Sequence, residues 1–343
     1  MTRPICFGII GAGVAAETHA REIHNVADAE LISVFARDKQ KAAAFAAAFS
    51  IPRYASELDE FLSDPALDAV IVTTPNGAHR DYAIAAAQAG KHVIVEKPLE
   101  ITSSRAREIM TACDENGVGL SVIYHRAHSL AALQAAEDIR NGALGRIFLV
   151  NILDNEYRKP SYYQGDPWRG TRSMEGGGCV ITQSTHLIDL AQLLLGPITS
   201  VYAQTQTVLH DIETEDAAVA VFHLGSGVMG SFSSSTAAFP GQRHLMTITG
   251  TEGTIVFNGE HDEILFRQTA KDGLTHRIPP AFSFGDLQNP RDYPTHGQRA
   301  QLQAIVNDLQ QGKTPNDGPR GLLSVQVVEA IYRSSAEGRP VSL

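Results

Sequence analysis

The sequence has few cysteines, a single tryptophan and no long apolar run, and these shortages exclude several classes of protein. Its three cysteines, Cys6, Cys113 and Cys179, are scattered and odd in number. Their spacing fits neither a disulfide framework nor a metal site, so we expect reduced thiols and no bound metal. No apolar run approaches the ~20 residues that span a bilayer, and no signal peptide pattern precedes the first strand. We therefore expect a cytoplasmic protein without a membrane segment.

Lysine-rich blocks are also absent. The chain has 28 Lys and Arg against 38 Asp and Glu, a formal net charge of −10, which argues against nucleic acid as a partner. Its 343 residues, of which 43% are hydrophobic, are enough for about two globular domains, each with a sizeable core.

A glycine turn directly follows a short apolar strand at the N-terminus. The strand at 5–10 leads into the pattern Gly-x-Gly-x-x-Ala at 11–16, which is typical of dinucleotide binding. Gly11 allows the tight turn, Gly13 lets a pyrophosphate approach the backbone, and Ala16 allows close packing of helix on strand. The alternative is an ordinary strand-to-helix turn. The residues predicted to face the phosphates, with the N–H groups of the helix start, are Gly11, Gly13, Val14 and Ala15.

The end of the second predicted strand, 31–35, bears on the choice of cofactor. NAD-binding folds usually place an acidic residue here for the ribose hydroxyls, whereas an arginine accommodates the 2′-phosphate of NADP. This chain has Ala36 at that position, followed by Arg37 and Asp38. The pattern favours NADP over NAD, with Ala36 and Arg37 lining the site, although Asp38 remains able to reach a ribose.

Two further predicted strands, 69–72 and 91–95, end in polar residues. Ligands bind at the carboxyl ends of strands in open parallel sheets, so these ends are candidate site positions. A lysine next to apolar strands is poorly hydrated and its pKa shifts readily. The alternative for Lys97 is a surface ion pair. The residues that follow the two strands are Thr74, Pro75, Asn76 and His79, then Glu96, Lys97 and Pro98.

Together these motifs resemble the Gfo/Idh/MocA oxidoreductases, the glucose–fructose oxidoreductase and inositol dehydrogenase family. The resemblance rests on the glycine turn, on Thr-Pro-Asn with His79, on Ala-Gly-Lys-His-Val-Ile-Val-Glu-Lys-Pro-Leu at 89–99, and on the segment 329–340. It implies an α/β chain: an N-terminal Rossmann domain, then an α+β domain with a large, mostly antiparallel open sheet. It also implies NADP or NAD as cofactor and a catalytic role for Lys97. The cofactor-binding residues it implies after these two strands are Thr74, Pro75, Asn76, His79, Glu96 and Lys97.

We expect the Rossmann domain to span 1–123 and the substrate-binding and oligomerisation domain to span 124–343, with the terminal helix packing back on the first domain. Strands dominate from Ser200 onward, and the segment 268–292 is expected to be irregular. Alternating apolar residues such as Ala217, Val219 and Val221 suit contact with a second subunit, which favours a homodimer or homotetramer.

A polar and aromatic loop at 157–170 contains the only tryptophan of the chain. Loops of this chemistry often cover carbohydrate sites. The alternative is a cluster of arginines and aromatic rings that ties the loop down. The predicted substrate-binding residues here and at the domain boundary are Tyr124, Arg126, Tyr157, Trp168 and Arg169.

The segment after Gly176–Gly178 is predicted to be a helix with Thr182, His186 and Asp189 on one face. A lone histidine on a helix is usually structural. In the family, however, the matching segment carries a catalytic histidine four residues after an aspartate, and here Thr182 stands in place of that aspartate. The resemblance therefore implies Lys97 and His186 as the acid–base pair. We expect Gln183 to supply part of the missing polar contact, and Thr182, Gln183 and His186 to contact substrate.

The expected function is hydride transfer between a nicotinamide cofactor and a secondary alcohol or ketone of a sugar, inositol or related polyol. Two alternatives remain open: an NAD-dependent glycoside hydrolase of the same family, and a non-catalytic nucleotide-sensing regulator on the same scaffold.

Overall fold

The computed structural model describes residues 3–242, 244–259, 262–277, 291 and 293–343. The chain forms two compact units, Met1–Tyr124 with Gln298–Leu322, and His125–Gly297 with Leu323–Leu343. The single boundary expected near residue 124 thus misses the return of Gln298–Leu322 to the first unit. The return has a packing reason, because Leu302, Ile305 and Val306 join the hydrophobic core of that unit.

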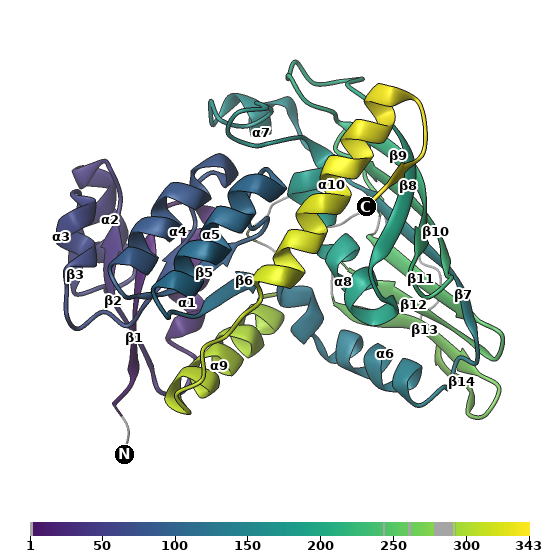
Figure 1. The fold of residues 1–343 in the computed structure, drawn as a ribbon, viewed down its shortest axis with the longest axis horizontal. Coiled ribbons are helices and arrows are strands. Elements are labelled where there is room, and N and C mark those ends of the chain that lie inside the picture. Colours follow the sequence, from purple (N-terminus) through teal and green to yellow (C-terminus); the bar gives the residue numbers. More distant parts are fainter. Residues whose placement is uncertain (1–2, 243, 260–261, 278–290, 292) are drawn as a thin grey trace. The chain divides into compact units, whose positions relative to one another are not determined.

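The first unit contains a six-stranded parallel sheet in the order β3-β2-β1-β4-β5-β6 (Figure 1). This order is that of the doubly wound dinucleotide-binding fold and confirms the predicted Rossmann domain. The strands are β1 (Ile5–Ile10), β2 (Ala29–Phe35), β3 (Arg53–Ala55), β4 (Ala69–Val72), β5 (His92–Glu96) and β6 (Leu120–Ile123). The helices are α1 (Val14–Ile23), α2 (Lys39–Ala48), α3 (Leu58–Leu62), η1 (Asn76–Ala78), α4 (His79–Gln88) and α5 (Ser103–Glu115). Two later helices contribute as well: α9 (His296–Gln310) belongs to this unit from Gln298 onward, and α10 (Gly318–Glu337) belongs to it as far as Leu322.

The central strand β4 is apolar along its whole length because it is covered on both faces. All four of its residues are fully buried. A strand buried on both faces reads as a continuous hydrophobic run, which is why the sequence predicted its bounds correctly.

The second unit contains a nine-stranded mixed sheet in the order β14-β13-β12-β11-β7-β10-β9-β8-β15, in which only the pair β7 and β10 is parallel. The mostly antiparallel sheet expected for this domain is confirmed. The strands are β7 (Ile147–Asn155), β8 (Ile198–Gln206), β9 (Ala217–Leu224), β10 (Met229–Ser235), β11 (Leu245–Gly250), β12 (Gly253–Asn258), β13 (Glu263–Thr269), β14 (Gly273–Arg277) and β15 (Val341–Ser342). The helices are η2 (His125–His128), α6 (Leu130–Arg140), α7 (Pro160–Gln164), η3 (Val180–Ser184), α8 (Thr185–Leu195) and the rest of α10.

The expectation of irregular structure from residue 268 is wrong as far as residue 277, because β13 and β14 form a hairpin. The reason is Arg267, which is buried within β13 and donates to both carboxylate oxygens of Asp138 at 2.7 Å. A buried arginine interrupts the apolar alternation by which a strand is predicted. The remainder of the expected irregular segment, 278–290 and 292, lies outside the described residues.

The two faces of the large sheet differ in composition. Along β9, Ala218, Ala220 and Phe222 are buried, while Val219 and Val221 between them are more than half exposed. The helices α6 and α8 lie over the buried face (Figure 1). The opposite face therefore presents apolar side chains that no helix of the described residues covers.

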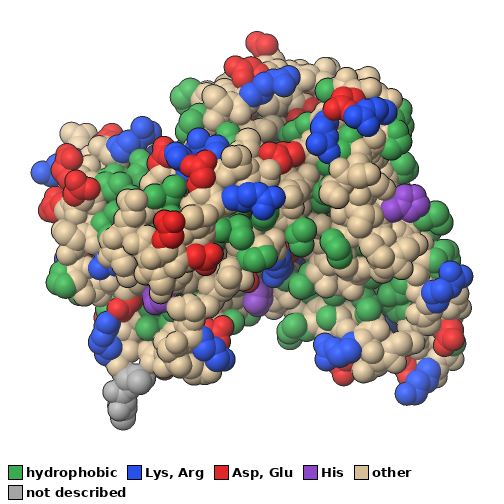
Figure 2. All heavy atoms as spheres, viewed as in Figure 1, with side chains coloured by type: hydrophobic (Ala, Val, Ile, Leu, Met, Phe, Trp, Pro, Cys, Tyr) green, Lys and Arg blue, Asp and Glu red, His purple; other side chains and the backbone are tan. Residues whose placement is uncertain are grey.

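Charged side chains of both signs are interspersed on the face of the molecule in Figure 2. Within the described residues, no helix combines the length and the hydropathy needed to cross a membrane.

Candidate functional site

The glycine turn after β1 contains two glycines with different surroundings: the backbone conformation requires Gly11, whereas Gly13 has open space beside it. Gly11 has φ +117°, and a Cβ there would lie 2.6 Å from Oγ1 of Thr73. A Cβ on Gly13, in contrast, would have no atom within 4 Å, and no side chain caps α1 at this residue. The first N–H groups of a helix have no partner within the helix and attract anions. The residues present therefore fit the pyrophosphate of a dinucleotide.

At the end of β2 the two charged side chains have different surroundings. Oδ1 of Asp38 caps α2 by accepting from the backbone N–H groups of Gln40 at 2.8 Å and Lys41 at 3.1 Å. Ala36 is buried, and Arg37 is exposed. The Asp38 carboxylate thus holds the start of α2, whereas Arg37, which is also exposed, precedes the helix.

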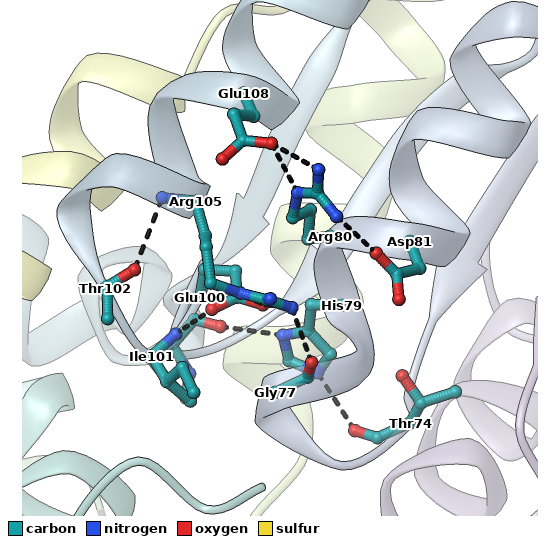
Figure 3. A network of polar contacts seen from close by, with 11 residues as sticks. Thr74, Gly77, His79, Arg80, Asp81, Glu100, Ile101, Thr102, Arg105 and Glu108 are labelled. Atoms are coloured by element: carbon teal, nitrogen blue, oxygen red, sulfur yellow. Dashed lines mark hydrogen bonds and ion pairs between the residues drawn. The ribbon is translucent and has the colours of Figure 1, made fainter. Parts of the chain in front are cut away.

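His79 ties together the segments that follow β4 and β5 (Figure 3). Its Nε2 lies 2.9 Å from the carbonyl oxygen of Thr74, and its Nδ1 lies 2.9 Å from that of Pro98. The ring is 1% exposed, and burial lowers the pKa of His79 below its ordinary value. Both ring nitrogens face backbone carbonyls, so His79 joins the two segments, and its contact with the cofactor stays a prediction.

An ion pair between a buried glutamate and a partly exposed arginine, next to His79, was not foreseen from the sequence. Glu100 is fully buried and accepts from Nε of Arg105 at 2.8 Å, while Nη2 of Arg105 donates to the carbonyl of Gly77 at 2.7 Å (Figure 3). Thr102 caps the helix that carries Arg105. The network holds the backbone of the 74–77 segment in place. In the sequence, the capping position at Thr102 was the only local signal of this network.

The turn at Glu96 and Lys97 ends β5. Oε2 of Glu96 accepts from the backbone N–H of Lys97 at 3.2 Å, and Oε1 lies 2.8 Å from Nε2 of His19. Lys97 is half-buried, and its peptide bond to Pro98 is cis. The glycine turn, the 74–77 segment and Lys97 thus all follow carboxyl ends of strands in one parallel sheet, where such sheets bind ligands.

In the second unit, His186 follows a π-helical turn, η3, which the sequence did not predict. The carboxylate of Glu215 holds the start of this turn, since it accepts from Gly178 N at 3.0 Å and from Val180 N at 3.0 Å. The hydroxyl of Tyr332 donates to the same carboxylate at 2.9 Å. Burial raises the pKa of Glu215 above its ordinary value. A Cβ on Gly178 would overlap the carbonyl oxygen of Glu215, so packing requires this glycine.

The π turn changes the expected relation between Thr182 and His186. Thr182 donates its hydroxyl to the carbonyl of Gly178 at 2.6 Å, back along its own helix. A π turn contains more residues than an α turn, so positions four apart across it do not align as they do in an α-helix. The prediction of a regular α-helix through Thr182 is therefore wrong, and the shared face of Thr182, His186 and Asp189 stays a prediction. Single π turns inside helices are frequent at functional sites.

His186 is 7% exposed, and its ring meets the ring of His125 edge to face, with centroids 4.4 Å apart. Asp189 is buried, whereas Thr182 and Gln183 are partly exposed.

Another predicted site residue, Tyr124, belongs to the first unit. It is 1% exposed, and the guanidinium of Arg320 lies over its ring.

The loop at 157–170 is organised around Arg169. Its guanidinium lies 4.1 Å from the ring centroid of Tyr162 and 4.6 Å from that of Trp168, and its Nε bonds to Asp166 at 3.1 Å. Tyr157 lies edge to face with the ring of Phe239. These contacts favour the alternative in which arginine and aromatic rings tie the loop down.

A buried charged cluster at the end of β7 was also missed. Glu156 pairs with Arg158 at 2.6 Å, and Asp154 lies 3.3 Å from Nδ1 of His244. The predicted site residue Arg126 belongs here, because its Nη2 lies 3.5 Å from the same His244 nitrogen. The spacing of 154, 156 and 158, which places three charges on one face of an extended chain, was the available signal.

The three cysteines are free thiols, and burial raises the pKa of Cys113 to about 12. Within the described residues no group of three or more His, Cys, Asp or Glu side chains is arranged to hold a metal ion.

Comparison with known proteins agrees with this architecture. Residues 5–124 match the family model described as oxidoreductase family, NAD-binding Rossmann fold, and residues 132–256 match the GFO/IDH/MocA C-terminal domain. The chain is 30% identical to 1,5-anhydro-D-fructose reductase of Ensifer adhaerens over 98% of each chain. It is 28% identical to an NADP(+) scyllo-inositol 2-dehydrogenase of Bacillus subtilis, over 84% of this chain and 82% of the relative.

Among solved structures, the WlbA dehydrogenase of Bordetella pertussis, in complex with NADH and UDP-GlcNAcA, superposes with a TM-score of 0.85. It is 32% identical to this chain, and the match covers 100% of this chain and 99% of that one.

Proposed function

The chain belongs to the Gfo/Idh/MocA family of NAD-binding oxidoreductases, and on this premise we propose that it transfers a hydride from a secondary carbinol carbon of a sugar, inositol or related polyol, or to the carbon of the matching ketone. One observation carries the proposal. The open turn at Gly13 and the half-buried Lys97 both follow carboxyl ends of strands in the same parallel sheet. A phosphate site and a basic group at one sheet edge suit a nicotinamide dinucleotide and a substrate hydroxyl.

Few protein groups are needed for this reaction. A bound nicotinamide supplies the redox chemistry, while the protein positions the reacting carbon and moves the hydroxyl proton. We assign the proton transfer to His186 and the stabilisation of the developing alkoxide to Lys97. The N–H groups of Val14 and Ala15 hold the phosphates.

NADP is the preferred cofactor in this proposal. Asp38, the acidic side chain nearest the expected ribose position, is bonded to the backbone of α2, and Arg37 is exposed beside it. An arginine suits a 2′-phosphate through charge-assisted hydrogen bonds. The relatives include an NADP(+) enzyme and one crystallised with NADH, so family membership alone does not decide the preference.

The exposed face of the large sheet is the proposed dimer interface. Tyr202, Val219, Val221 and Met229 on the adjoining strands β8, β9 and β10 are all at least 40% exposed. Two copies of such an apolar sheet face bury each other in an isologous dimer. Val221→Glu should shift the sedimentation coefficient to that of a monomer, and an unchanged dimer would refute this interface.

The proposed location of the protein is the cytoplasm, and its three free thiols support this proposal.

The experiment that tests the function is a substrate panel of aldoses, sugar acids, inositols and sugar nucleotides with NADP⁺ and NAD⁺, followed by the absorbance of reduced nicotinamide. We expect reduction of NADP⁺ by at least one class. Cleavage of a glycoside without net cofactor reduction would indicate a hydrolase. Tight cofactor binding without any turnover would indicate a nucleotide sensor.

A further inference from the structure

We infer that His19, on the helix that begins at the phosphate turn, is a positioning residue for Lys97. The inference rests on the proposed function, in which Lys97 contacts the reacting oxygen. It adds a residue that neither the sequence motifs nor the family match assigns.

His19 is one of two polar residues among the buried residues of α1. The others are Ala16, Ala20 and Ile23, which are small or apolar, and Glu22, which pairs with Arg299 at 2.6 Å. His19 lies on the same buried side with an exposure of 0%. Burying an imidazole costs free energy unless both ring nitrogens are satisfied, so its partners define its role.

Both ring nitrogens of His19 have partners within the first unit. Nε2 lies 2.8 Å from Oε1 of Glu96, and the side-chain amide nitrogen of Gln298 lies 3.2 Å from Nδ1 and 2.9 Å from Nε2. With the proton on Nε2, the ring donates to the Glu96 carboxylate through Nε2 and accepts from the Gln298 amide at Nδ1. Gln298 is 6% exposed and comes from the returning helix α9. The ring orientation is therefore fixed from two sides.

Glu96 connects the fixed ring of His19 to the backbone of Lys97. One carboxylate oxygen is held by His19, and the other accepts from the backbone N–H of Lys97 at 3.2 Å. On the far side of Lys97, the carbonyl of Pro98 is held by His79 at 2.9 Å. The backbone that carries Lys97 thus lies between two segments, each anchored to a buried imidazole. Of the two, His19 alone belongs to the helix whose start is proposed to bind the phosphates.

This arrangement has a functional consequence. Misplacing a reacting group by ~1 Å can cost on the order of 10²-fold in rate. If the Glu96 carboxylate loses the donor from His19, the turn at Lys97 relaxes while the phosphate turn at Gly11–Gly13 stays intact. The chemical step should then suffer more than cofactor binding.

The test measures the reactivity of the Lys97 amine directly and needs no substrate. Wild type and variants are labelled with trace acetic anhydride, and the acetylation rate of Lys97 is measured by mass spectrometry relative to the exposed Lys39. We expect His19→Leu to raise this ratio at least about threefold, because a relaxed turn exposes the amine. His19→Gln, whose amide can replace the Nε2–H donor, should stay near wild type. His24→Leu, an exposed histidine at the end of the same helix, is the matched control.

An unchanged ratio in folded His19→Leu would overturn the inference. If His19→Leu does not fold, Glu96→Ala replaces it, since Glu96 is partly exposed. Removal of the carboxylate should raise the Lys97 ratio in the same way, and no change would again overturn the inference. Where both variants fold, their effects should not add, because they interrupt one chain of contacts. Fully additive effects would also refute it.

The outcome separates this inference from the proposed function. If the panel yields a substrate, His19→Leu should lower kcat about tenfold or more, with the Kd for NADPH within about twofold of wild type. If the panel yields none, the acetylation ratios still decide whether His19 positions Lys97.

Discussion

The two units each start a helix with glycines, and the glycines serve opposite purposes. At Gly13 a side chain would meet no atom within 4 Å, whereas at Gly178 it would overlap the backbone of Glu215. The first turn leaves room for a ligand, and the second is filled by the protein itself. Glycine before a helix therefore marks an anion site only where the space beside it is open.

The two turns also differ in what holds them. In the first unit Gly11 packs on Thr73, directly after a neighbouring strand of the same sheet. In the second, Glu215 and Tyr332 reach the π turn from distant parts of the sequence. The first site can be recognised from a local motif, while the second depends on contacts that only the folded chain creates.

The largest effects should come from the residues proposed to act in catalysis, one in each unit. Lys97→Ala and His186→Ala should each reduce kcat by about 10²–10⁴-fold, because general acid–base groups contribute that much. The Kd for NADPH should change little, since neither residue belongs to the phosphate turn. Steady-state rates and fluorescence titrations measure both quantities. Activity within a few-fold of wild type would remove that residue from the mechanism.

The glycine comparison can be tested by matched alanine substitutions. Gly178→Ala should lower the free energy of unfolding by about 1–3 kcal/mol, the range typical of overpacking. Gly13→Ala should leave stability almost unchanged and weaken cofactor binding, because the new methyl group enters the open space. Chemical denaturation and cofactor titration of both variants give the answer. A destabilised Gly13→Ala with normal affinity would reverse our interpretation of the two turns.

A smaller effect is expected at the end of β2. Arg37→Ala should weaken NADPH binding about tenfold, the loss of one charge-assisted contact, and leave NADH binding unchanged. Titration of each cofactor against wild type and variant provides the test. If NADH binds more tightly to the wild type and the substitution affects neither cofactor, the NADP preference is wrong.

The smallest effect concerns His79, and its sign follows from the lowered pKa. Burial lowers the folded-state pKa below the ordinary value near 6.5, so the neutral ring is favoured in the folded protein. The contribution of His79 to stability is then present above about pH 6.5 and is lost as the pH falls toward the folded-state pKa. His79→Gln should flatten this decline in melting temperature below pH 6.5. An equally steep decline would show that other groups cause it.

Much of the first unit was predictable because its signals are local. The bounds of β4 follow from a continuous apolar run, and the glycine turn follows from its spacing. Arg267 concealed β13 because its buried charge is neutralised by Asp138, a residue far away in the sequence. The π turn was missed for the same reason. Glu215 and Tyr332 hold the turn, and no pattern in the sequence around either residue indicates that it lies near Gly178.

Net hydride transfer can be tested by the stoichiometry of the reaction. A substrate from the panel is incubated with limiting NADP⁺, and the oxidised product and the NADPH are quantified together by chromatography and absorbance. We expect one mole of NADPH for each mole of ketone or lactone formed, with both falling in parallel in His186→Ala. Product that accumulates without NADPH would contradict it.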